Sequence, residues 1–404
     1  MWEQIRSNQI RSVILVAGMA ALLLLMGYFL GLYFLDSGTG GMIITLILWA
    51  VMNLVAFFQG DNIMLALSKA KKIKRDDYPR LYNIVEEMRI ASGLEKMPDI
   101  YIIDDPALNA FATGRNPNQA AIAVTSGLLQ KLNRDELQGV IGHEMAHVNN
   151  RDVLLMSLCG ILLGTIVILA WYATYTLFFS SMTGGRRSSS SGGGQAQLII
   201  LAIAIIFIIL APIAAQLIYF AISRKREYLA DSSSALYTRY PEGLASALEK
   251  LAASTAPVKS ANKSLAPMYI INPFRKKGRA ASDLSSTHPP ISERIRILRS
   301  MAGGASLADY DNAFRQIHKG GKRVIPLSAI TDTDTVSLRP AAPEAVQQEA
   351  KLGKADRTRE VSGLMWRLNN YKVITCVCDT KLKVPPKLKN TNVKCPHCGR
   401  VNRV

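Results

Sequence analysis

The sequence predicts a mainly α-helical membrane protein with a soluble α+β unit and a small metal-binding unit near its C-terminus. Four long apolar runs predict four transmembrane helices. A segment with helical periodicity carries two histidines four residues apart, and four of the chain's five cysteines stand in two pairs close to its end. These three observations favour a membrane-attached protein with two metal sites.

The apolar runs cover residues 13–35, 41–58, 153–179 and 198–222. Each approaches or exceeds the roughly 20 residues that a helix needs to cross a bilayer. A short turn joins the first two runs, which predicts a helical hairpin. The first run is too long for a cleavable signal peptide and has no clear cleavage site, so we expect it to be a retained anchor.

The basic residues predict how these helices are oriented. Lys and Arg precede the first run and follow the second and fourth, whereas the turn inside the hairpin has none. These residues are Arg6, Arg11, Lys69, Lys71, Lys72, Lys74, Arg75, Arg224, Lys225 and Arg226. The positive-inside rule therefore places both termini and the paired histidines in the cytoplasm of a multi-pass inner- or plasma-membrane protein.

The net charge of +18 raises the question of a nucleic-acid partner. The basic residues gather near the ends of the apolar runs and in the tail, where anionic lipid attracts them. No helix-turn-helix or RNA-binding signature is present, so the sequence favours the lipid bilayer over nucleic acid as a partner.

The apolar runs divide the chain into six predicted parts. We expect a transmembrane hairpin over 1–60, two soluble segments at 61–152 and 223–320 separated by transmembrane helices over 153–222, a polar linker over 321–360, and a tail unit over 361–404. Within the first soluble segment, residues 99–103 and 120–125 have the composition of short strands, and 109–114 is a further candidate strand.

The segment His143-Glu144-Met145-Ala146-His147 carries the chemistry. Two imidazoles four residues apart lie on one face of a helix and can bind one zinc ion. Glu144 between them can take a proton from a water molecule at the zinc, so we expect it to be the catalytic residue. The residues from Asn133 to Glu136 predict the capped start of this helix.

Two histidines leave a hydrolytic zinc site one protein ligand short. Glu227 is the best candidate, because the fourth apolar run returns the chain to the same side of the bilayer as His143. Asp231 lies one helical turn later and can accept the second N–H of a ligand histidine. The alternative for Glu227 is an ion pair with Arg224 or Arg226.

At this point a family resemblance is plain. The stretch from His143 to Asp152 resembles the active-site segment of HtpX-type membrane zinc metallopeptidases, relatives of the type I CAAX prenyl proteases. Residues 227–231 match their Glu-x-x-x-Asp segment, and 109–114 and 287–289 resemble two further segments. The resemblance covers roughly residues 1–300. It implies a mostly helical zincin-like peptidase domain with a small sheet on four membrane helices, and a role in quality-control proteolysis and the stress response.

The tail carries a second predicted metal site. Cys376 and Cys378 form one pair, and Cys395 and Cys398 form another. Two thiolate pairs can hold one tetrahedral structural zinc, and the tail resembles a zinc ribbon, which the plainest members of the family lack. The single residue inside the first pair weakens the pattern, and the alternative is four free cytoplasmic thiols.

We therefore interpret the chain as a zinc-dependent endopeptidase that cleaves membrane or misfolded proteins at the cytoplasmic face. The alternatives are a CAAX-type prenyl protease, which four membrane runs disfavour, and a catalytically idle membrane scaffold that binds partners through the ribbon.

Two further residues have two possible roles each. Asn109 either contacts the backbone of an extended substrate or forms a turn. His288 either donates to the oxyanion or gates the zinc, or it caps a helix that starts at Ile291.

Overall fold

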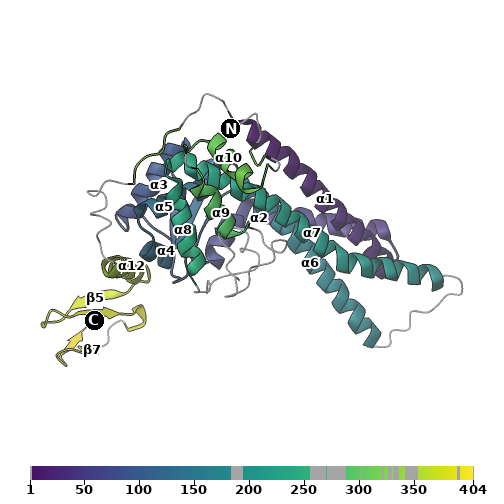
Figure 1. Cartoon of the computed structure of the whole chain (residues 1–404). Coiled ribbons are helices and arrows are strands. Elements are labelled where there is room, and N and C mark those ends of the chain that lie inside the picture. The colour runs from purple at the N-terminus through teal and green to yellow at the C-terminus, as the bar shows by residue number, and fades with distance from the viewer. Residues whose placement is uncertain are drawn as a thin grey trace.

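The protein is represented by a computed structural model, which describes residues 2–182, 194–254, 270, 288–301, 303–320, 323–325, 330, 336–341, 354–388 and 392–403. Four long helices contain the four apolar runs: α1 (Trp2–Leu35), α2 (Gly38–Leu67), α6 (Asp152–Met182) and α7 (Gly194–Thr238). They project from a unit of shorter helices and a sheet (Figure 1). The loop between the third and fourth runs, and most of the predicted linker over 321–360, lie outside the described residues.

Fewer spans than the four predicted stand out as transmembrane among the described residues. Ala17–Leu35 in α1 and Ile161–Phe178 in α6 are long and apolar enough to cross a bilayer. α2 adds a third span only if its halves, Gly38–Met52 and Phe57–Leu67, which are inclined by 63°, are taken together. In α7 the apolar part, Leu201–Leu217, is shorter than the roughly 20 residues that a helix needs to cross a bilayer. The helix passes Pro212 and continues far beyond the apolar part to Thr238.

Small residues allow the predicted hairpin of α1 and α2 to close tightly. α1 ends at Leu35, and α2 begins at Gly38 behind Ser37, whose side chain accepts a hydrogen bond from the Gly40 amide. A Cβ atom on Gly31 would lie 2.5 Å from the Cα atom of Gly41, so the two backbones meet where neither residue has a side chain. Such contacts are a usual way for membrane helices to pack.

The three candidate strands of the sequence are present in one four-stranded sheet. Its order is β1 (Lys71–Lys72), β2 (Asp99–Ile103), β4 (Ala121–Thr125) and β3 (Ala110–Thr113). β2 and β4 are parallel, and β1 and β3 are antiparallel to their neighbours. β3 is therefore an edge strand and β4 an interior strand.

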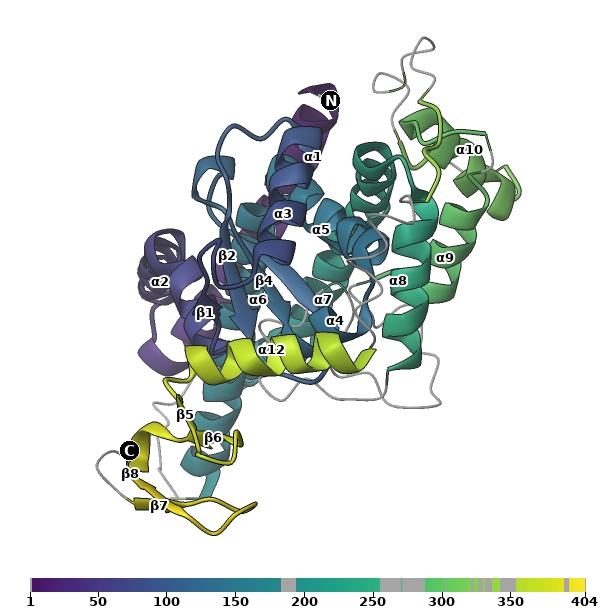
Figure 2. The ribbon, with the colours of Figure 1, turned by 90° about the vertical axis from the view of Figure 1, so that its left-hand side faces the viewer.

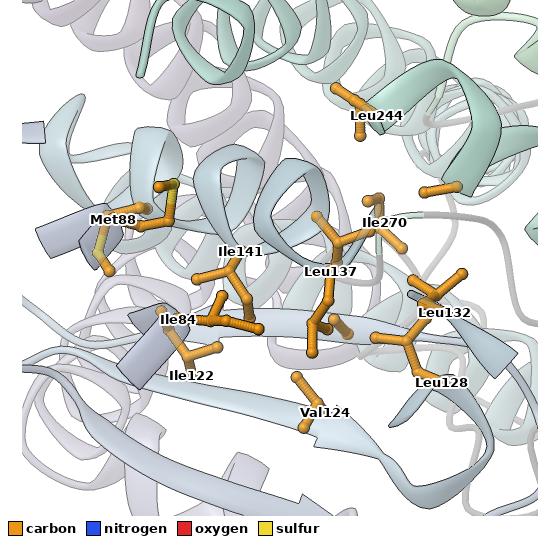
Figure 3. Close-up of a cluster of buried hydrophobic side chains, with 14 of the residues drawn as sticks. Ile84, Met88, Ile122, Val124, Leu128, Leu132, Leu137, Ile141, Leu244 and Ile270 are labelled. Carbon is orange, nitrogen blue, oxygen red and sulfur yellow. The ribbon is translucent and has the colours of Figure 1, made fainter. Parts of the chain in front are cut away.

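Helices cover both faces of this sheet. On one face, Ile84 of α3 (Pro79–Ser92) and Leu137 and Ile141 of α5 (Arg134–Asn149) lie over Ile122 and Val124 of β4 (Figure 3). On the other face, the end of α2 places Met64 and Leu65 against three side chains of the sheet, Phe111, Ala121 and Ala123. The membrane hairpin is thus part of the packing that holds the sheet.

The remaining helices complete the unit around α5. They are α4 (Ser126–Lys131), α8 (Pro241–Ala253), α9 (Ile291–Arg299), α10 (Leu307–Ile317) and α12 (Lys354–Leu368), with a short 3₁₀ turn over Pro117–Gln119. α12 begins inside the range predicted to be linker, and it buries Val361, Leu364 and Met365 in the main core. Figure 2 shows α12 lying across this unit, with the tail hairpins beyond it.

The tail consists of two antiparallel hairpins. β5 (Lys372–Thr375) pairs with β6 (Lys381–Val384), and β7 (Asn392–Lys394) pairs with β8 (Val401–Arg403); Pro386–Leu388 forms a 3₁₀ turn. Their shared core is very small and includes Cys376, Leu382 and Cys395. So little apolar burial rarely stabilises a fold without a metal or disulfides.

We predict that Gly31→Leu destabilises the hairpin by about 2 kcal/mol, because overpacking a close contact forces the helices apart. The measurement is thermal unfolding of the full chain in detergent. Gly18→Leu is the matched control, since a Cβ atom at Gly18 in the same helix meets nothing within 4 Å. Equal melting temperatures for the two variants would contradict the packing argument.

Candidate metal centre and active site

The helix that carries the paired histidines begins as the sequence predicts. Asn133 Oδ1 accepts the Glu136 amide at 2.9 Å, and Glu136 Oε2 accepts the Asn133 amide at 2.8 Å, which confirms the predicted cap. Three turns later, α5 presents His143 and His147 on one face, with their Nε2 atoms 3.2 Å apart. His143 is completely buried, and His147 is largely buried.

α7 brings a carboxylate to these two imidazoles. Glu227 Oε2 lies 3.5 Å from His143 Nε2, and Glu227 Oε1 lies 3.4 Å from His147 Nε2. One donor atom from each of the three residues lies within 4.8 Å of the other two. Two imidazole nitrogens and one carboxylate oxygen form a donor set that suits zinc and leaves one position open.

Each imidazole is oriented from behind by a different aspartate. His143 Nδ1 lies 3.0 Å from Asp231 Oδ1, as the sequence suggested, and His147 Nδ1 lies 3.1 Å from Asp152 Oδ2. An N–H donated from each Nδ1 leaves the Nε2 lone pair directed toward Glu227. Both ring orientations therefore match what a metal at the centre requires.

Two buried arginines hold these carboxylates in turn. Arg294 of α9 donates to Asp231 at 2.6 and 2.8 Å and lies 3.2 Å from Glu227 Oε2. Arg226 pairs with Asp152 rather than with Glu227, so that form of the alternative ion pair is wrong. Sequence reasoning missed Asp152, Arg226 and Arg294 as parts of the site.

The carboxylates also govern how the imidazoles bind protons. Burial disfavours the charged imidazolium, but hydrogen bonds to Asp231 and Glu227 raise the pKa of His143. Burial also acts to lower the pKa of His147, but Asp152 and Glu227 outweigh it and raise that pKa to about 10. For Glu227, burial favours the neutral acid, yet the surrounding His288, His143, His147 and Arg294 bring its pKa well below the usual range. The centre therefore attracts positive charge, which a divalent cation can supply in place of protons.

Glu144 lies beside this cluster and is not one of the groups that converge. Its side chain is 1% exposed, and Oε1 has no hydrogen-bond partner among the described residues. Burial raises the pKa of Glu144, while the two histidines and a hydrogen bond from the Ala112 amide of β3 oppose the rise. A raised carboxylate pKa suits a group that takes up a proton near neutral pH.

His288 and Asn109 are both buried, but they differ in position. His288 Nε2 lies 3.9 Å from Glu227 Oε1, and the N-cap of α9 is Pro290, with no side-chain cap bond. The helix-cap interpretation of His288 is therefore wrong.

Asn109 precedes β3, and its Oδ1 accepts a hydrogen bond from the Ala110 amide at 3.1 Å, a local contact of the kind expected of a turn residue.

The outer edge of β3 runs beside Glu144 and is occupied at one end. The Ile270 amide donates to the Ala110 carbonyl at 3.1 Å, and Arg294 donates to the Ile270 carbonyl at 3.2 Å. The Ile270 side chain is 1% exposed. Ile270 thus occupies, on the side of Ala110, part of the edge where an extended peptide would pair.

The four tail cysteines also converge. Cys376 Sγ lies 3.5 Å from Cys398 Sγ, and Cys378 Sγ lies 3.7 Å from Cys395 Sγ, with all four sulfurs within 4.8 Å. These distances exceed a disulfide bond and approach the ~3.8 Å edge of a tetrahedron with Zn–S bonds of about 2.3 Å. The cluster fits one structural zinc.

Comparison with known proteins places the chain among peptidases. Residues 76–302 match the model of peptidase family M48. The chain is 43% identical over 300 residues to a protease HtpX homolog of Dictyoglomus turgidum. The matched region covers 74% of this chain and 94% of that protein. The chain is 46% identical to the homolog of Syntrophobacter fumaroxidans over 73% of this chain and 99% of that one.

Among solved structures, the chain is similar to the crystal structure of S. mikatae Ste24p. The sequence identity is 19% and the TM-score is 0.40, over 74% of this chain and 67% of that one. So distant a likeness carries no argument about the site. The four tail cysteines lie beyond the residues that match the family model.

We predict that Asp152→Asn lowers the affinity of the histidine site for zinc at least tenfold, because the amide no longer holds His147 by charge. The measurement is zinc content by elemental analysis during chelator titration of the full chain. Cys395→Ser should remove the tail zinc and so identify which ion is lost. Asp99→Asn breaks only the exposed pair with Lys72 and serves as control. Unchanged zinc affinity in Asp152→Asn would exclude the assigned role.

Proposed function

Because the chain belongs to peptidase family M48 and is a membrane zinc endopeptidase of the HtpX type, we propose that His143, His147 and Glu227 hold its zinc and that Glu144 is its general base. The observation that carries this proposal is the convergence of one donor atom each from His143, His147 and Glu227 within 4.8 Å, in a largely buried site beside Glu144. The Oε1 atom of Glu144 has no hydrogen-bond partner among the described residues.

The roles of the residues follow from their positions. Zinc bound there would polarise the scissile carbonyl and make water more acidic. Glu144 takes a proton on its carboxylate from the attacking water and passes it to the leaving amine. Asp231 and Asp152 keep the two imidazoles in the tautomer that faces inward. Arg294 and Arg226 balance the buried negative charge of those aspartates.

The sheet supports a specific way of binding substrate. An extended peptide can add to the edge strand of a sheet, and β3 lies at an edge of this sheet, whereas β4 is flanked on both sides. Since the Ile270 amide already donates a hydrogen bond to the Ala110 carbonyl, we propose that the substrate backbone pairs with β3 from Ala112 onward, next to Glu144. Asn109 then shapes the start of β3 rather than contacting the substrate.

The cellular setting is part of the proposal. The basic residues that flank the apolar runs support four transmembrane helices with both termini and the active site on the cytoplasmic side. Membrane or misfolded proteins reaching that face are the substrates we propose, in a quality-control role. The tail holds a second, structural zinc through its four cysteines. Nothing in the described site favours prenyl specificity or an idle scaffold.

We predict that Glu144→Gln keeps both zinc ions and loses proteolysis by about a hundredfold or more, since an amide cannot accept the proton. Cleavage of an unfolded protein in detergent and zinc content are measured on the same preparation. Asp104→Asn, on the surface of the soluble unit, is the control. Substantial cleavage by zinc-loaded Glu144→Gln would refute the base assignment, and loss of zinc would assign Glu144 to the metal centre instead.

We further predict that His288→Ala changes turnover several-fold at an unchanged melting temperature. Its imidazole lies near Glu227 without capping α9, so its effect should be on the reaction. Lower turnover indicates a donor to the oxyanion, and higher turnover indicates a group that competes with water at the zinc. Wild-type turnover with a lower melting temperature would assign His288 to structure.

A further inference from the structure

A hollow beside the end of β3 carries two arginines that the peptidase chemistry does not use. It is lined by Thr113, Gly114, Arg115, Asn116, Ala120, Val148, Arg151 and Val153. The hollow is small and is partly open to solvent. A small, partly open hollow suits a group presented from outside, such as a head group, better than an enclosed small molecule.

Neither arginine is neutralised by an ion pair with a carboxylate of the described residues. Arg151 stands between α5 and α6 in the left-handed conformation, with φ of 57°. Arg115 Nε donates to Gln119 Oε1 at 2.6 Å. The nearby Asp61 carboxylate is occupied by the Thr113 hydroxyl and by the Gly114 and Arg115 amides, so it attracts Arg115 without an ion pair. The hollow therefore keeps a net positive charge.

The two arginines lie where the apolar parts of two membrane helices end. Residues 153–179 contain no charged side chain, and Arg151 comes two residues before them. Residues 38–60 are likewise uncharged, and Phe57 and Phe58 near their end are exposed. The Arg115 guanidinium lies over both rings, 5.7 and 5.9 Å from their centroids. An arginine that lies against apolar side chains at the end of an apolar run, with its charged group directed to water, is typical of the layer of lipid head groups.

We propose that Arg115 and Arg151 bind the phosphate of an anionic phospholipid in this hollow. Two guanidinium groups from separate segments can share one phosphate, for which arginine is better suited than lysine. The adjoining phenylalanines provide apolar contact for the acyl chains. Because Thr113 and Gly114 also line the hollow, the bound lipid lies at the C-terminal end of the proposed substrate edge.

The first test titrates delipidated full-length protein in detergent with short-chain phosphatidylglycerol and counts bound lipid by native mass spectrometry. We expect saturable binding that Arg115→Gln/Arg151→Gln weakens about thirtyfold, at roughly 1 kcal/mol for each arginine. Arg299→Gln/Arg359→Gln, which removes two arginines that are exposed on the soluble part and away from the apolar runs, should bind as the wild type does. Equal lipid affinity in both double variants overturns the proposal.

Two further arms separate other ligands from lipid. Inorganic phosphate that displaces phosphatidylglycerol at equal concentration would show a free-phosphate site and overturn the lipid assignment. An acidic peptide whose KM rises in Arg115→Gln/Arg151→Gln, with lipid binding unchanged, would assign the hollow to substrate instead.

A measurement on the wild-type chain covers the case in which the double variant does not fold. Photoactivatable phosphatidylglycerol should crosslink to segments 113–116 or 148–151. Crosslinks confined to other segments would overturn the proposal.

Discussion

Buried charge between α5 and α7 is the constraint on which the rest of the structure depends. Four buried carboxylates surround the two imidazoles, those of Glu144, Asp152, Glu227 and Asp231. They face two buried arginines, Arg226 and Arg294, which leaves an excess of two negative charges when all four carboxylates are ionised. Unpaired charge in an apolar interior is very costly, so the network is stable only when a cation or bound protons complete it. A divalent ion has the charge that the excess requires.

The same constraint explains how the elements are arranged. Asp152 is available at the start of α6 because α5 ends immediately before it, at Asn149. Arg294 reaches Asp231 because α9 packs against α7 and α8. The sheet places Ala112 against Glu144. The start of α6, the middle of α7, helix α9 and the sheet thus each contribute a partner to the buried cluster on α5, and the end of α2 supports the sheet from its other face.

Local patterns were enough to predict α5 and its cap, the three strands, the paired histidines and the two cysteine pairs, because each of those signals lies within a few residues. Glu227 lies far from the histidines in the sequence and was inferred only because two histidines leave a zinc site one ligand short. Arg226 meets Asp152 across 74 residues, and Arg294 meets Asp231 across 63. The periodicity of apolar residues along the sequence cannot predict ion pairs between residues so far apart. Alternation also could not decide that β3 rather than β4 is the edge, or that α12 joins the main core from within an apparently polar linker.

α7 carries one end of the site and one stretch of the membrane part on a single uninterrupted helix of 45 residues, about 68 Å long. Glu227 and Asp231 both face α5 only because they are four residues apart on that helix. A rotation by one residue, about 100°, would turn both carboxylates away from His143. The rotation of α7 about its own axis therefore decides whether the ligand set is complete.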